Sequence, residues 1–423
     1  MNFDAVVFDL DGTISDSGLG ITRSVAYAAQ KMGLEVPSDE ILRDFVGPSL
    51  YQSFIKYLKL SPEESLKAIE LYRERHRVIG WKEARIYTGI YELLASLKRQ
   101  GVHVALASSK PLDLCEWTLE YFGIADFFDR VSAPDNKNTS DDKMKLIKAA
   151  LPDNCKHPCM VGDRRFDIEG AHAAGVHAVG VLYGYGSKEE LAAARADELC
   201  TDVEALRRVL LGDLPKLPGY FITMEGADGC GKSTQHKLLY DALSDCGLDV
   251  IKTREPGGCP VSEKIRSLLL DVSSQGMTSE CEALLFAAAR AQHVNDAILP
   301  AVKSGKIVLC DRFVDSSIAY QGAGRELGDW VRMINSRAVA GCTPDLTLVF
   351  DLPPEEALKR RQHATGLDRI EQAASDFHAR TYNAFIDMCN SGETRFCRVD
   401  ASGSIEQIAA SVRQIVLNRL KER

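Results

Sequence analysis

The chain has 423 residues, of which 45% are hydrophobic and 26% are charged, and this balance excludes collagen, coiled-coil rods and wholesale disorder. The formal net charge of −9 provides no basic field to favour nucleic acid or an anionic membrane as a partner. No run of about 18 apolar residues occurs, and acidic residues stand where a signal peptide would carry Lys or Arg. We therefore expect a cytoplasmic protein without a membrane-spanning helix.

Short β-branched runs alternate with longer amphipathic patterns along most of the chain. This alternation predicts α/β architecture with parallel sheets. The expected strands are residues 5–8, 102–107, 159–161, 178–181, 220–224, 249–252, 306–309, 346–350 and 396–399.

Two segments interrupt this alternation. Residues 17–87 contain amphipathic helical patterns and no convincing strand, so they predict an inserted helical subdomain. Residues 211–219 hold two Pro and two Gly, which is typical of an interdomain linker. The predicted organisation is two doubly wound parallel-sheet domains, at residues 1–212 and 219–423, joined by residues 213–218.

Two acidic residues follow the first predicted strand. Asp9 and Asp11 are two residues apart, so in extended chain their side chains point the same way and can face one pocket. Gly12 then permits a sharp turn. Two close carboxylates repel each other unless a cation lies between them, and hard oxygen ligands suit Mg²⁺. Asp9 and Asp11 are therefore candidate metal ligands.

A second acidic pair follows a later predicted strand. Asp163 lies at the strand end, and Asp167 comes four residues later, at the start of a helical stretch. Ser108, at the end of another strand, offers a hydroxyl to a phosphoryl oxygen, and Lys143 offers a positive charge. Ligands collect at the carboxyl ends of strands in open parallel sheets. Any one of these residues alone is explained as well by a helix cap or a solvated surface, so the prediction depends on the whole set.

The elements DxDGT, a strand-end hydroxyl, a Lys and GDxxxD occur in this order. As a set they resemble the haloacid dehalogenase-like hydrolases, specifically their phosphoglycolate-phosphatase-like branch, over about residues 1–212. The resemblance implies that Asp9 is a nucleophile that forms an aspartyl-phosphate. It implies that Asp11 protonates the leaving group and then activates water.

The same resemblance implies that Ser108 and Lys143 hold the phosphoryl group. It implies that Asp163 binds Mg²⁺ with the support of Asp167, and that the helical insert is a cap that closes over the substrate. The segment DDKMK also offers Lys145 as the lysine, but the spacing to the following apolar residues favours Lys143.

The second half begins with a predicted strand, a glycine-rich loop and an amphipathic helix. The loop sequence GADGCGKST fits GxxxxGK[ST] in the strand–loop–helix context that this pattern requires. Its glycines let backbone N–H groups converge on phosphate oxygens. Lys232 would reach the β/γ-phosphates, and Ser233 would ligate Mg²⁺. The residues assigned to ATP are Gly226, Asp228, Gly229, Cys230, Gly231, Lys232, Ser233 and Thr234.

Further motifs follow the loop in order. They are TREPGG at 253–258, Phe286 and Arg290 four apart on a helix, DRF at 311–313, SSIAYQG at 316–322 and LDRIE at 367–371. Together they resemble the bacterial thymidylate kinases over about residues 219–423. The resemblance implies phosphorylation of dTMP to dTDP, with ATP as co-substrate and Mg²⁺ as cofactor. It also implies a homodimer formed through the kinase domain.

The resemblance implies roles for individual residues. Arg254 and Arg312 would grip the dTMP phosphate, Phe286 would stack on the base, and Tyr320 would pack against the deoxyribose. The residues implied to bind dTMP are Asp228, Arg254, Phe286, Arg290, Arg312, Ser317, Tyr320 and Gln321. Lys232 and Arg312 would be catalytic, and Ser233 and Asp311 would be metal ligands.

The sequence departs from this family at two places. Phe313 stands where the DR[YH] triplet has Tyr or His. The loop lacks the extra Arg of the eukaryotic kinases, so an Arg of the lid should stabilise the transferring phosphoryl group. Arg361 is the candidate, with Arg360 and Arg369 as alternatives, although this lid is poorer in Arg than many bacterial lids.

The fusion predicts a bifunctional enzyme that acts on small-molecule nucleotides. Hydrolysis of dTMP would undo the kinase reaction, so the phosphatase is expected to prefer another phosphate ester. Two alternatives stay open for the N-terminal half. It could be a regulatory or scaffolding module that binds metal and phosphate without turnover, or a phosphomutase.

Overall fold

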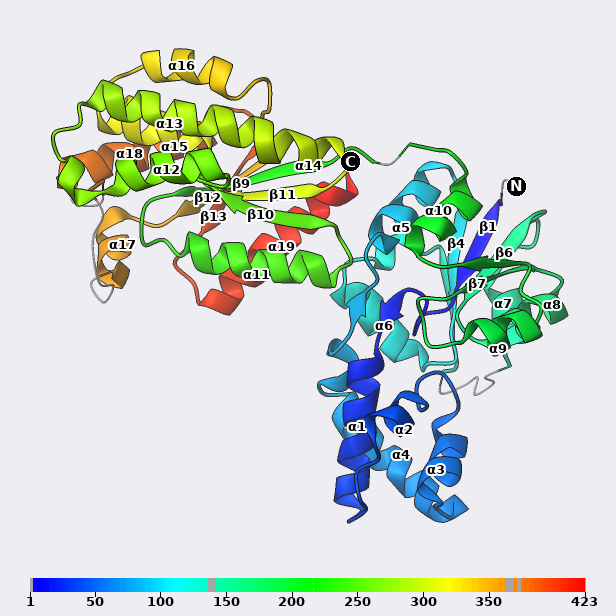
Figure 1. Cartoon of the computed structure of the whole chain (residues 1–423). Coiled ribbons are helices and arrows are strands. Elements are labelled where there is room, and N and C mark those ends of the chain that lie inside the picture. The colour runs from blue at the N-terminus through cyan, green and yellow to red at the C-terminus, as the bar shows by residue number, and fades with distance from the viewer. Residues whose placement is uncertain (1–2, 136–141, 216, 362–368, 371–373, 423) are drawn as a thin grey trace. The chain divides into compact units, whose positions relative to one another are not determined.

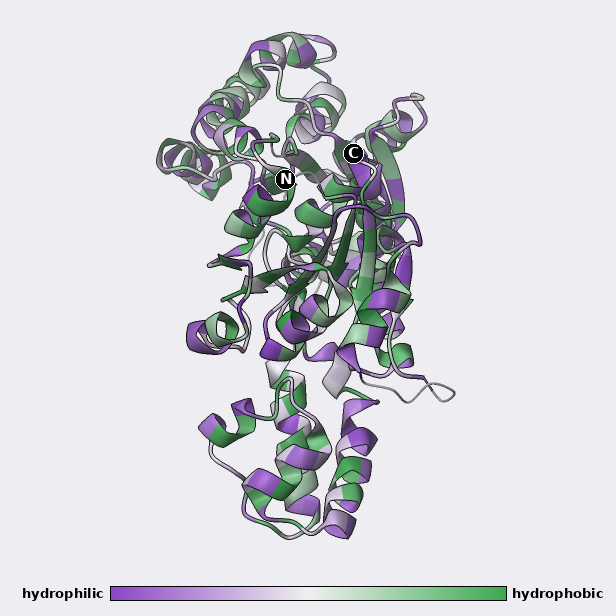
Figure 2. Ribbon diagram, turned by 90° about the vertical axis from the view of Figure 1, so that its right-hand side faces the viewer, coloured by the Kyte–Doolittle hydropathy of each residue, from purple (hydrophilic) through white to green (hydrophobic). Residues whose placement is uncertain are grey.

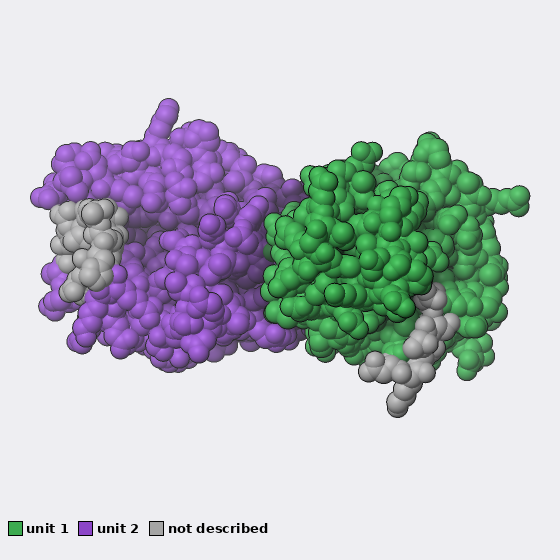
Figure 3. Space-filling model, turned by 90° about the horizontal axis from the view of Figure 1, so that it is seen from below, with its two compact units in different colours: residues 1–215, 245–248 green, residues 216–244, 249–423 purple. Residues whose placement is uncertain are grey.

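The computed structural model describes residues 3–135, 142–215, 217–361, 369–370 and 374–422. The chain divides into two compact units, which Figure 3 colours green and purple. Unit 1 comprises residues 1–215 and 245–248, and unit 2 comprises residues 216–244 and 249–423. Each unit is built around a parallel sheet of its own.

Among the described residues, the main sheet of unit 1 has six parallel strands in the order β5-β4-β1-β6-β7-β8. The strands are β1 (Ala5–Phe8), β4 (His103–Ala107), β5 (Arg130–Ser132), β6 (Pro158–Gly162), β7 (His177–Val181) and β8 (Glu198–Cys200). In the centre, Phe8 of β1 pairs with Leu106 of β4 and Val161 of β6. All of β1 is buried, as expected of a strand inside a parallel sheet that helices cover.

Helices connect these strands. They are α5 (Ile90–Arg99), α6 (Leu112–Tyr121), α7 (Lys143–Ala150), α8 (Arg165–Ala174), α9 (Lys188–Ala193) and α10 (Val203–Leu211). Leu146 and Ile147 of α7 and Ile168 of α8 pack with Val7 and Met160 of the sheet in one buried cluster. The helix α7 therefore begins at Lys143 beside the carboxyl ends of the central strands.

The predicted helical insertion contains four α-helices between the two strands of a short antiparallel pair, β2 (Ser15–Asp16) and β3 (Arg85–Ile86). The helices are α1 (Gly18–Lys31), α2 (Asp39–Arg43), α3 (Leu50–Leu58) and α4 (Pro62–His76), followed by the short turn η1 (Gly80–Lys82). A capping box between Ser61 and Glu64, with Pro at the first helical position, fixes the start of α4. These helices form a core of their own around Phe45 and Phe54.

The sheet of unit 2 has five parallel strands within the described part of the chain, in the order β10-β11-β9-β12-β13. The strands are β9 (Tyr220–Gly226), β10 (Val250–Arg254), β11 (Ile307–Asp311), β12 (Leu346–Asp351) and β13 (Phe396–Asp400). Thr223 of β9 pairs with Cys310 of β11 and Thr347 of β12, so the strand before the glycine-rich loop is central.

Helices cover both faces of this second sheet, and Figure 1 shows α11 and α19 on one face and α12 and α13 on the other. The helices are α11 (Lys232–Asp245), α12 (Pro260–Leu270), α13 (Ser279–His293), α14 (Leu299–Lys303), α15 (Val314–Ser317), α16 (Trp330–Ala338), α17 (Pro354–Arg361), α18 (Ser375–Cys389) and α19 (Ile405–Lys421). The wide-turn segments η4 (Val294–Ile298) and η5 (Ile318–Gly324) continue α13 and α15.

The structure confirms the predicted fold class of two parallel-sheet α/β domains, the first with a helical cap. Figure 2 shows the hydrophobic strands in the interior and mixed hydropathy on the helices around them. No helix among the described residues combines the length and the apolar character needed to cross a membrane.

Candidate active sites

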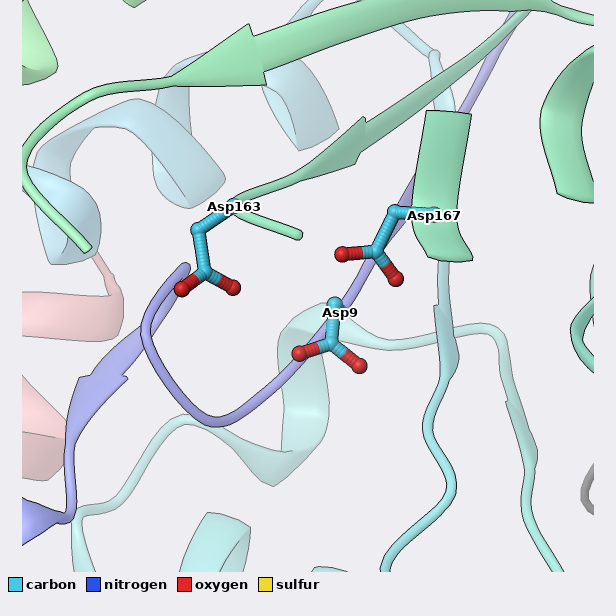
Figure 4. Close-up of side chains that lie close together, drawn as sticks. All are labelled: Asp9, Asp163 and Asp167. Atoms are coloured by element: carbon cyan, nitrogen blue, oxygen red, sulfur yellow. The ribbon is translucent and has the colours of Figure 1, made fainter. Parts of the chain in front are cut away.

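Three carboxylates meet at the carboxyl ends of the central strands of unit 1. Asp9 follows β1, Asp163 follows the neighbouring β6, and Asp167 lies in the first turn of α8. One oxygen atom of each carboxylate lies within 4.8 Å of the others, and Figure 4 shows the three side chains together. Adjacent strand ends are where an open parallel sheet collects a ligand, so the strand order explains why residues 154 positions apart converge.

This cluster carries more negative charge than its surroundings balance. Burial raises the pKa of Asp163 well above its ordinary value, and the charges of Asp167 and Asp9 add to that rise. Burial also raises the pKa of Asp9, against the opposing ammonium of Lys143. The donors are hard oxygen atoms within 4.8 Å of one another, which is the kind of ligand that a divalent cation such as Mg²⁺ prefers. The residues present therefore fit a magnesium site.

Lys143 is the lysine that reaches the carboxylates. Its Nζ donates to Asp9 Oδ1 at 2.6 Å and lies 2.6 Å from Asp167 Oδ1, and the two carboxylates raise its pKa although burial opposes them. Lys145, two residues along α7, has a side chain that is 66% exposed and lies 3.6 Å from Asp142. The structure thus brings the favoured candidate, Lys143, and not Lys145, to the site.

Asp11 lies apart from the three clustered carboxylates, although we expected it among the metal ligands. Its Oδ1 accepts a hydrogen bond from Lys110 Nζ at 3.1 Å. Burial opposes ionisation of Asp11, but the charge of Lys110 outweighs it and lowers the pKa of Asp11. Gly12, directly after it, has a φ of +90°, so the chain bends at this point as predicted. Both predicted roles of Asp11, in proton transfer and in metal binding, therefore stay predictions.

Ser108 and Lys110 come from the end of β4. Ser108 is buried and its Oγ accepts the backbone N–H of Lys110 at 3.3 Å. Sequence reasoning singled out the hydroxyl but gave Lys110 no role. The signal for Lys110 was the run SSK directly after a buried strand, which places a cation at the same sheet edge as the acids.

Tyr185, in the loop after β7, is a residue that sequence reasoning missed. Tyr185 donates its hydroxyl to Asp16 Oδ1 and accepts the backbone N–H of Gly18, both at 2.7 Å, where the chain enters the cap. Its backbone N–H donates to Asp163 Oδ2 at 2.8 Å. One residue therefore joins the entrance of the cap to the carboxylate cluster.

In unit 2, the glycine-rich loop runs from the end of β9 to the start of α11. Lys232 is buried and its Nζ donates to the carbonyl oxygens of Gly226 at 2.9 Å and Ala227 at 2.7 Å. Gly229 has a φ of +86°, and an added Cβ there would lie 2.5 Å from a backbone oxygen, so the turn needs glycine. Ser233 Oγ donates to Asp311 Oδ2 at 3.3 Å, which joins the loop to the end of β11.

Hydrogen bonds among Asp228, Arg312 and Tyr320 connect the loop to the DRF motif. Arg312 Nη2 donates to Asp228 Oδ1 at 2.6 Å, and the Tyr320 hydroxyl donates to Asp228 Oδ2 at 2.8 Å. The charges of Arg312 and Lys232 lower the pKa of Asp228 although burial opposes them. Arg312 has a φ of +70°, which is uncommon for a residue with a side chain, and this backbone directs its guanidinium to the loop.

A cavity of about 430 Å³ runs along these groups. The predicted site residues that line it are Asp228, Gly229, Gly231, Lys232, Ser233, Thr234, Arg254, Phe286, Arg290, Asp311, Arg312, Ser317, Tyr320 and Gln321. Gly226 and Cys230, also assigned to ATP, are not among its lining residues, and Cys230 is buried. The structure therefore gathers the loop and the later motifs around one space.

Buried hydrogen bonds hold one of the residues that line this cavity, Arg290. Arg290, which is 1% exposed, donates its Nε to Glu255 Oε2 at 2.8 Å and its Nη1 to Ser317 Oγ at 3.0 Å and to Asn335 Oδ1. Phe286 packs on the same helix against an apolar cluster that includes Tyr320. Such a wall offers one aromatic face beside one fixed guanidinium.

The lid arginines differ in their surroundings. Arg360 Nη1 donates to the carbonyl oxygen of Ala401 at 2.9 Å, and Arg369 Nη2 lies 2.8 Å from Glu282 Oε2. The side chain of Arg361, the expected catalytic arginine, lies outside the described part of the chain. Its role therefore stays a prediction.

Glu225 is a buried residue that sequence reasoning missed. It lies in β9 and accepts the backbone N–H of Phe313 at 2.7 Å and the hydroxyl of Ser316 at 2.6 Å. Burial and the charge of Asp315 raise the pKa of Glu225. The available signal was an acidic residue at the end of an otherwise apolar strand, and its position fixes the DRF turn beside the loop.

Comparisons with known proteins agree with this division. A family model described as Thymidylate kinase matches residues 224–412, and one described as Haloacid dehalogenase-like hydrolase matches residues 6–181. The thymidylate kinase of Finegoldia magna is 48% identical over 200 residues, which are 47% of this chain and 98% of that protein. The thymidylate kinase of an Exiguobacterium species is 46% identical over 207 residues, which are 49% of this chain and 98% of that protein.

Two solved structures are similar to about half of this chain. A predicted phosphatase from Clostridium acetobutylicum is 37% identical, covering 49% of this chain and 98% of its own, with a TM-score of 0.47. A putative phosphatase from Clostridium difficile is 35% identical, covering 50% of this chain and 100% of its own, with a TM-score of 0.46. This chain thus belongs to the thymidylate kinase family through its C-terminal half, which is joined to an N-terminal haloacid dehalogenase-like hydrolase domain.

Proposed function

We propose that the chain is a bifunctional phosphoryl-transfer enzyme. Unit 2 transfers the γ-phosphoryl group of ATP to dTMP and forms dTDP and ADP. Unit 1 hydrolyses a phosphate monoester through an aspartyl-phosphate. The observation that carries the proposal is that each unit gathers its own cations and carboxylates at the carboxyl ends of its own sheet.

The kinase reaction needs positioning and charge neutralisation more than covalent chemistry. Lys232 would hold the β/γ-phosphates of ATP, and Arg254 and Arg312 would hold the phosphate of dTMP. Ser233 and Asp311 would hold Mg²⁺, which supplies charge neutralisation on the phosphates when bound.

The thymine would occupy the end of the cavity formed by Phe286 and Arg290, whose aromatic face and guanidinium suit stacking and a hydrogen bond to a carbonyl oxygen. Tyr320, fixed by Asp228, would pack against the deoxyribose. The single cavity that holds both the loop and this wall supports a nucleoside monophosphate as the acceptor.

In the phosphatase reaction, a carboxylate oxygen of Asp9 attacks phosphorus and forms an acyl-phosphate, while the leaving alcohol takes a proton from Asp11. Water then gives a proton to Asp11 and attacks phosphorus, which releases phosphate and restores Asp9. The lowered pKa of Asp11 suits the second step, and an anionic phosphoryl group beside it would raise that pKa for the first.

Ser108 and Lys143 would hold the phosphoryl oxygens during both steps. Asp9, Asp163 and Asp167 would hold Mg²⁺, which neutralises charge on the phosphoryl group when bound. The convergence of the three carboxylates supports this site. Because hydrolysis of dTMP would undo the kinase reaction, we propose that the phosphatase acts on another ester.

Wild-type full-length protein tests both activities. dTDP formation from dTMP and ATP is measured by anion-exchange chromatography, and Lys232→Ala should abolish it while the exposed Lys237→Ala on the same helix should not. Phosphate release is measured from a panel of nucleoside and sugar phosphates. No dTDP from the wild type, or dTMP as the best ester, would contradict the proposal. No release from any ester would favour the non-catalytic module.

We also propose a homodimer formed through unit 2. Val261 and Leu268 on α12, Leu284 on α13 and Met333 on α16 are each about half exposed or more. The helix α13 packs against both α12 and α16, so these apolar residues lie on neighbouring helices. Sedimentation velocity should give a dimer for the wild type and a monomer for Leu284→Glu.

The twelve cysteines support a reducing, cytoplasmic location, since all of them are described and all are free thiols. Cell fractionation followed by labelling of free thiols on the recovered protein tests this location. Protein recovered with its cysteines in disulfides would contradict it.

A further inference from the structure

Glu282 is a buried carboxylate with three partners, two from the segment of η5 and one, Arg369, from a later part of the chain. It lies in the first turn of α13 and is 1% exposed. Its Oε1 accepts Gln321 Nε2 at 2.9 Å, and its Oε2 lies 3.2 Å from Arg325 Nη2 and 2.8 Å from Arg369 Nη2. Since a buried charge is costly unless it is paired and hydrogen-bonded, this arrangement fixes the three partners relative to α13.

The segments that Glu282 joins contribute to the cavity wall, at the part where we propose that the base binds. The helix α13 carries Phe286 one turn and Arg290 two turns after Glu282. Gln321 lines the cavity itself, and so does Ile370, which is next to Arg369. Arg369 is held further by its Nε, which donates to the carbonyl oxygen of Leu269 at 2.9 Å. One carboxylate therefore sets the spacing between the helix, Gln321 and Ile370.

Glu282 also fixes the orientation of the Gln321 amide. An ionised carboxylate only accepts hydrogen bonds, so the NH₂ group of Gln321 must face it. The amide oxygen Oε1 is then directed elsewhere, and it is buried without a hydrogen-bond partner among the described residues. Gln321 lines the cavity, and its Oε1 is a buried acceptor in that wall with no protein partner among the described residues. A base with a ring N–H donor, such as thymine, can use that acceptor, whereas cytosine presents an acceptor of its own at the same ring position.

We propose that Glu282 is a positioning residue for the kinase reaction, which acts through Gln321 and Ile370 to set dTMP affinity and pyrimidine selectivity. The inference rests on the proposed dTMP kinase activity. The proposal predicts an effect on the binding of dTMP and not on the binding of ATP, because none of the partners of Glu282 belongs to the glycine-rich loop.

Glu282→Gln tests the proposal in the full-length protein. The variant keeps the side-chain volume but removes the negative charge that holds Arg325 and Arg369. An amide can donate as well as accept, so it can pair with either the NH₂ group or the oxygen of Gln321. We expect the KM for dTMP to rise roughly ten-fold or more, as for loss of a hydrogen bond to a charged group, with the KM for ATP within about two-fold. The ratio of kcat/KM for dTMP to that for dCMP should fall. Glu280→Gln, an exposed residue in the same helical turn, is the matched control and should match the wild type.

Arg325→Gln is the second variant, since its side chain is 24% exposed and the protein should tolerate the change. It leaves the bond from Glu282 to Gln321 intact, so the KM for dTMP should rise by about three-fold, with the pyrimidine ratio unchanged. Equal rises in both KM values in either variant, or an unchanged KM for dTMP in Glu282→Gln, would overturn the proposal. Wild-type protein that makes no dTDP would instead overturn the proposed function.

Discussion

His76 provides an acid-sensitive contact in the cap of unit 1. The residue is 3% exposed, its ring stacks on Tyr72 with the centroids 4.9 Å apart, and its Nδ1 lies 3.4 Å from Ser24 Oγ. Burial lowers the pKa of His76 to about 4, with help from the charge of Lys110 and against that of Asp11. The folded state of the cap therefore favours the neutral form of the His76 imidazole over the protonated form.

The consequence is a loss of stability in acid. Because the pKa of His76 is about 4 in the folded chain and about 6.5 in the unfolded chain, the unfolded state binds more protons between these values. The contribution of His76 is fully present above about pH 6.5 and is lost as the pH falls toward about 4. The whole shift corresponds to about 3 kcal/mol, of which about 2 kcal/mol is lost between about pH 7 and pH 5.

Urea unfolding followed by tryptophan fluorescence measures this loss. In a Trp330→Phe background the remaining tryptophans, Trp81 and Trp117, both lie in unit 1 and report its unfolding. Between about pH 7 and pH 5 the parent should lose about 2 kcal/mol more than its His76→Gln variant, because every other titrating group is common to both. Equal losses in the two proteins would refute the reasoning.

Three further predictions test the two sites. Gly12→Ala should abolish phosphate release and spare dTDP formation, because an added Cβ would lie 2.2 Å from Asp163 Oδ2 at a φ of +90°; retained hydrolysis would argue against this geometry. Lys143→Met should lower phosphatase kcat by about 100-fold or more, while Lys145→Met should stay within about two-fold, and the reverse ranking would transfer the role to Lys145. Tyr320→Phe removes the hydroxyl that donates to the loop carboxylate and should raise the KM for dTMP about five-fold, whereas an unchanged value would leave that hydrogen bond without a role in dTMP binding.

The central strands could be predicted from the sequence, and the edges of the first sheet could not. The strand β1 has its predicted bounds, since an apolar run buried on both faces has a clear beginning and end. The strands β5 and β8 have three residues each and begin with Arg130 and Glu198 at the sheet edges. So few positions give no periodicity, and only pairing with β4 and β7 makes them strands.

The candidate sites divide in the same way. Asp9 and Asp163 could be singled out because each ends an apolar strand, and parallel order brings such ends together. Lys110 joins Asp11 across 99 residues, and Tyr185 reaches Asp163 from a loop after β7, so no local pattern marks either contact. Such contacts depend on how the folded chain brings loops together, which composition and spacing do not encode.

The most direct test of two separate phosphoryl-transfer sites is a crossed assay of Asp9→Asn and Lys232→Ala in the full-length protein, with dTDP formation and phosphate release measured on the same preparations. We predict that Asp9→Asn loses phosphate release and keeps dTDP formation, and that Lys232→Ala shows the opposite pattern. Loss of both activities in either folded variant, or phosphate release that persists in Asp9→Asn, would contradict the account.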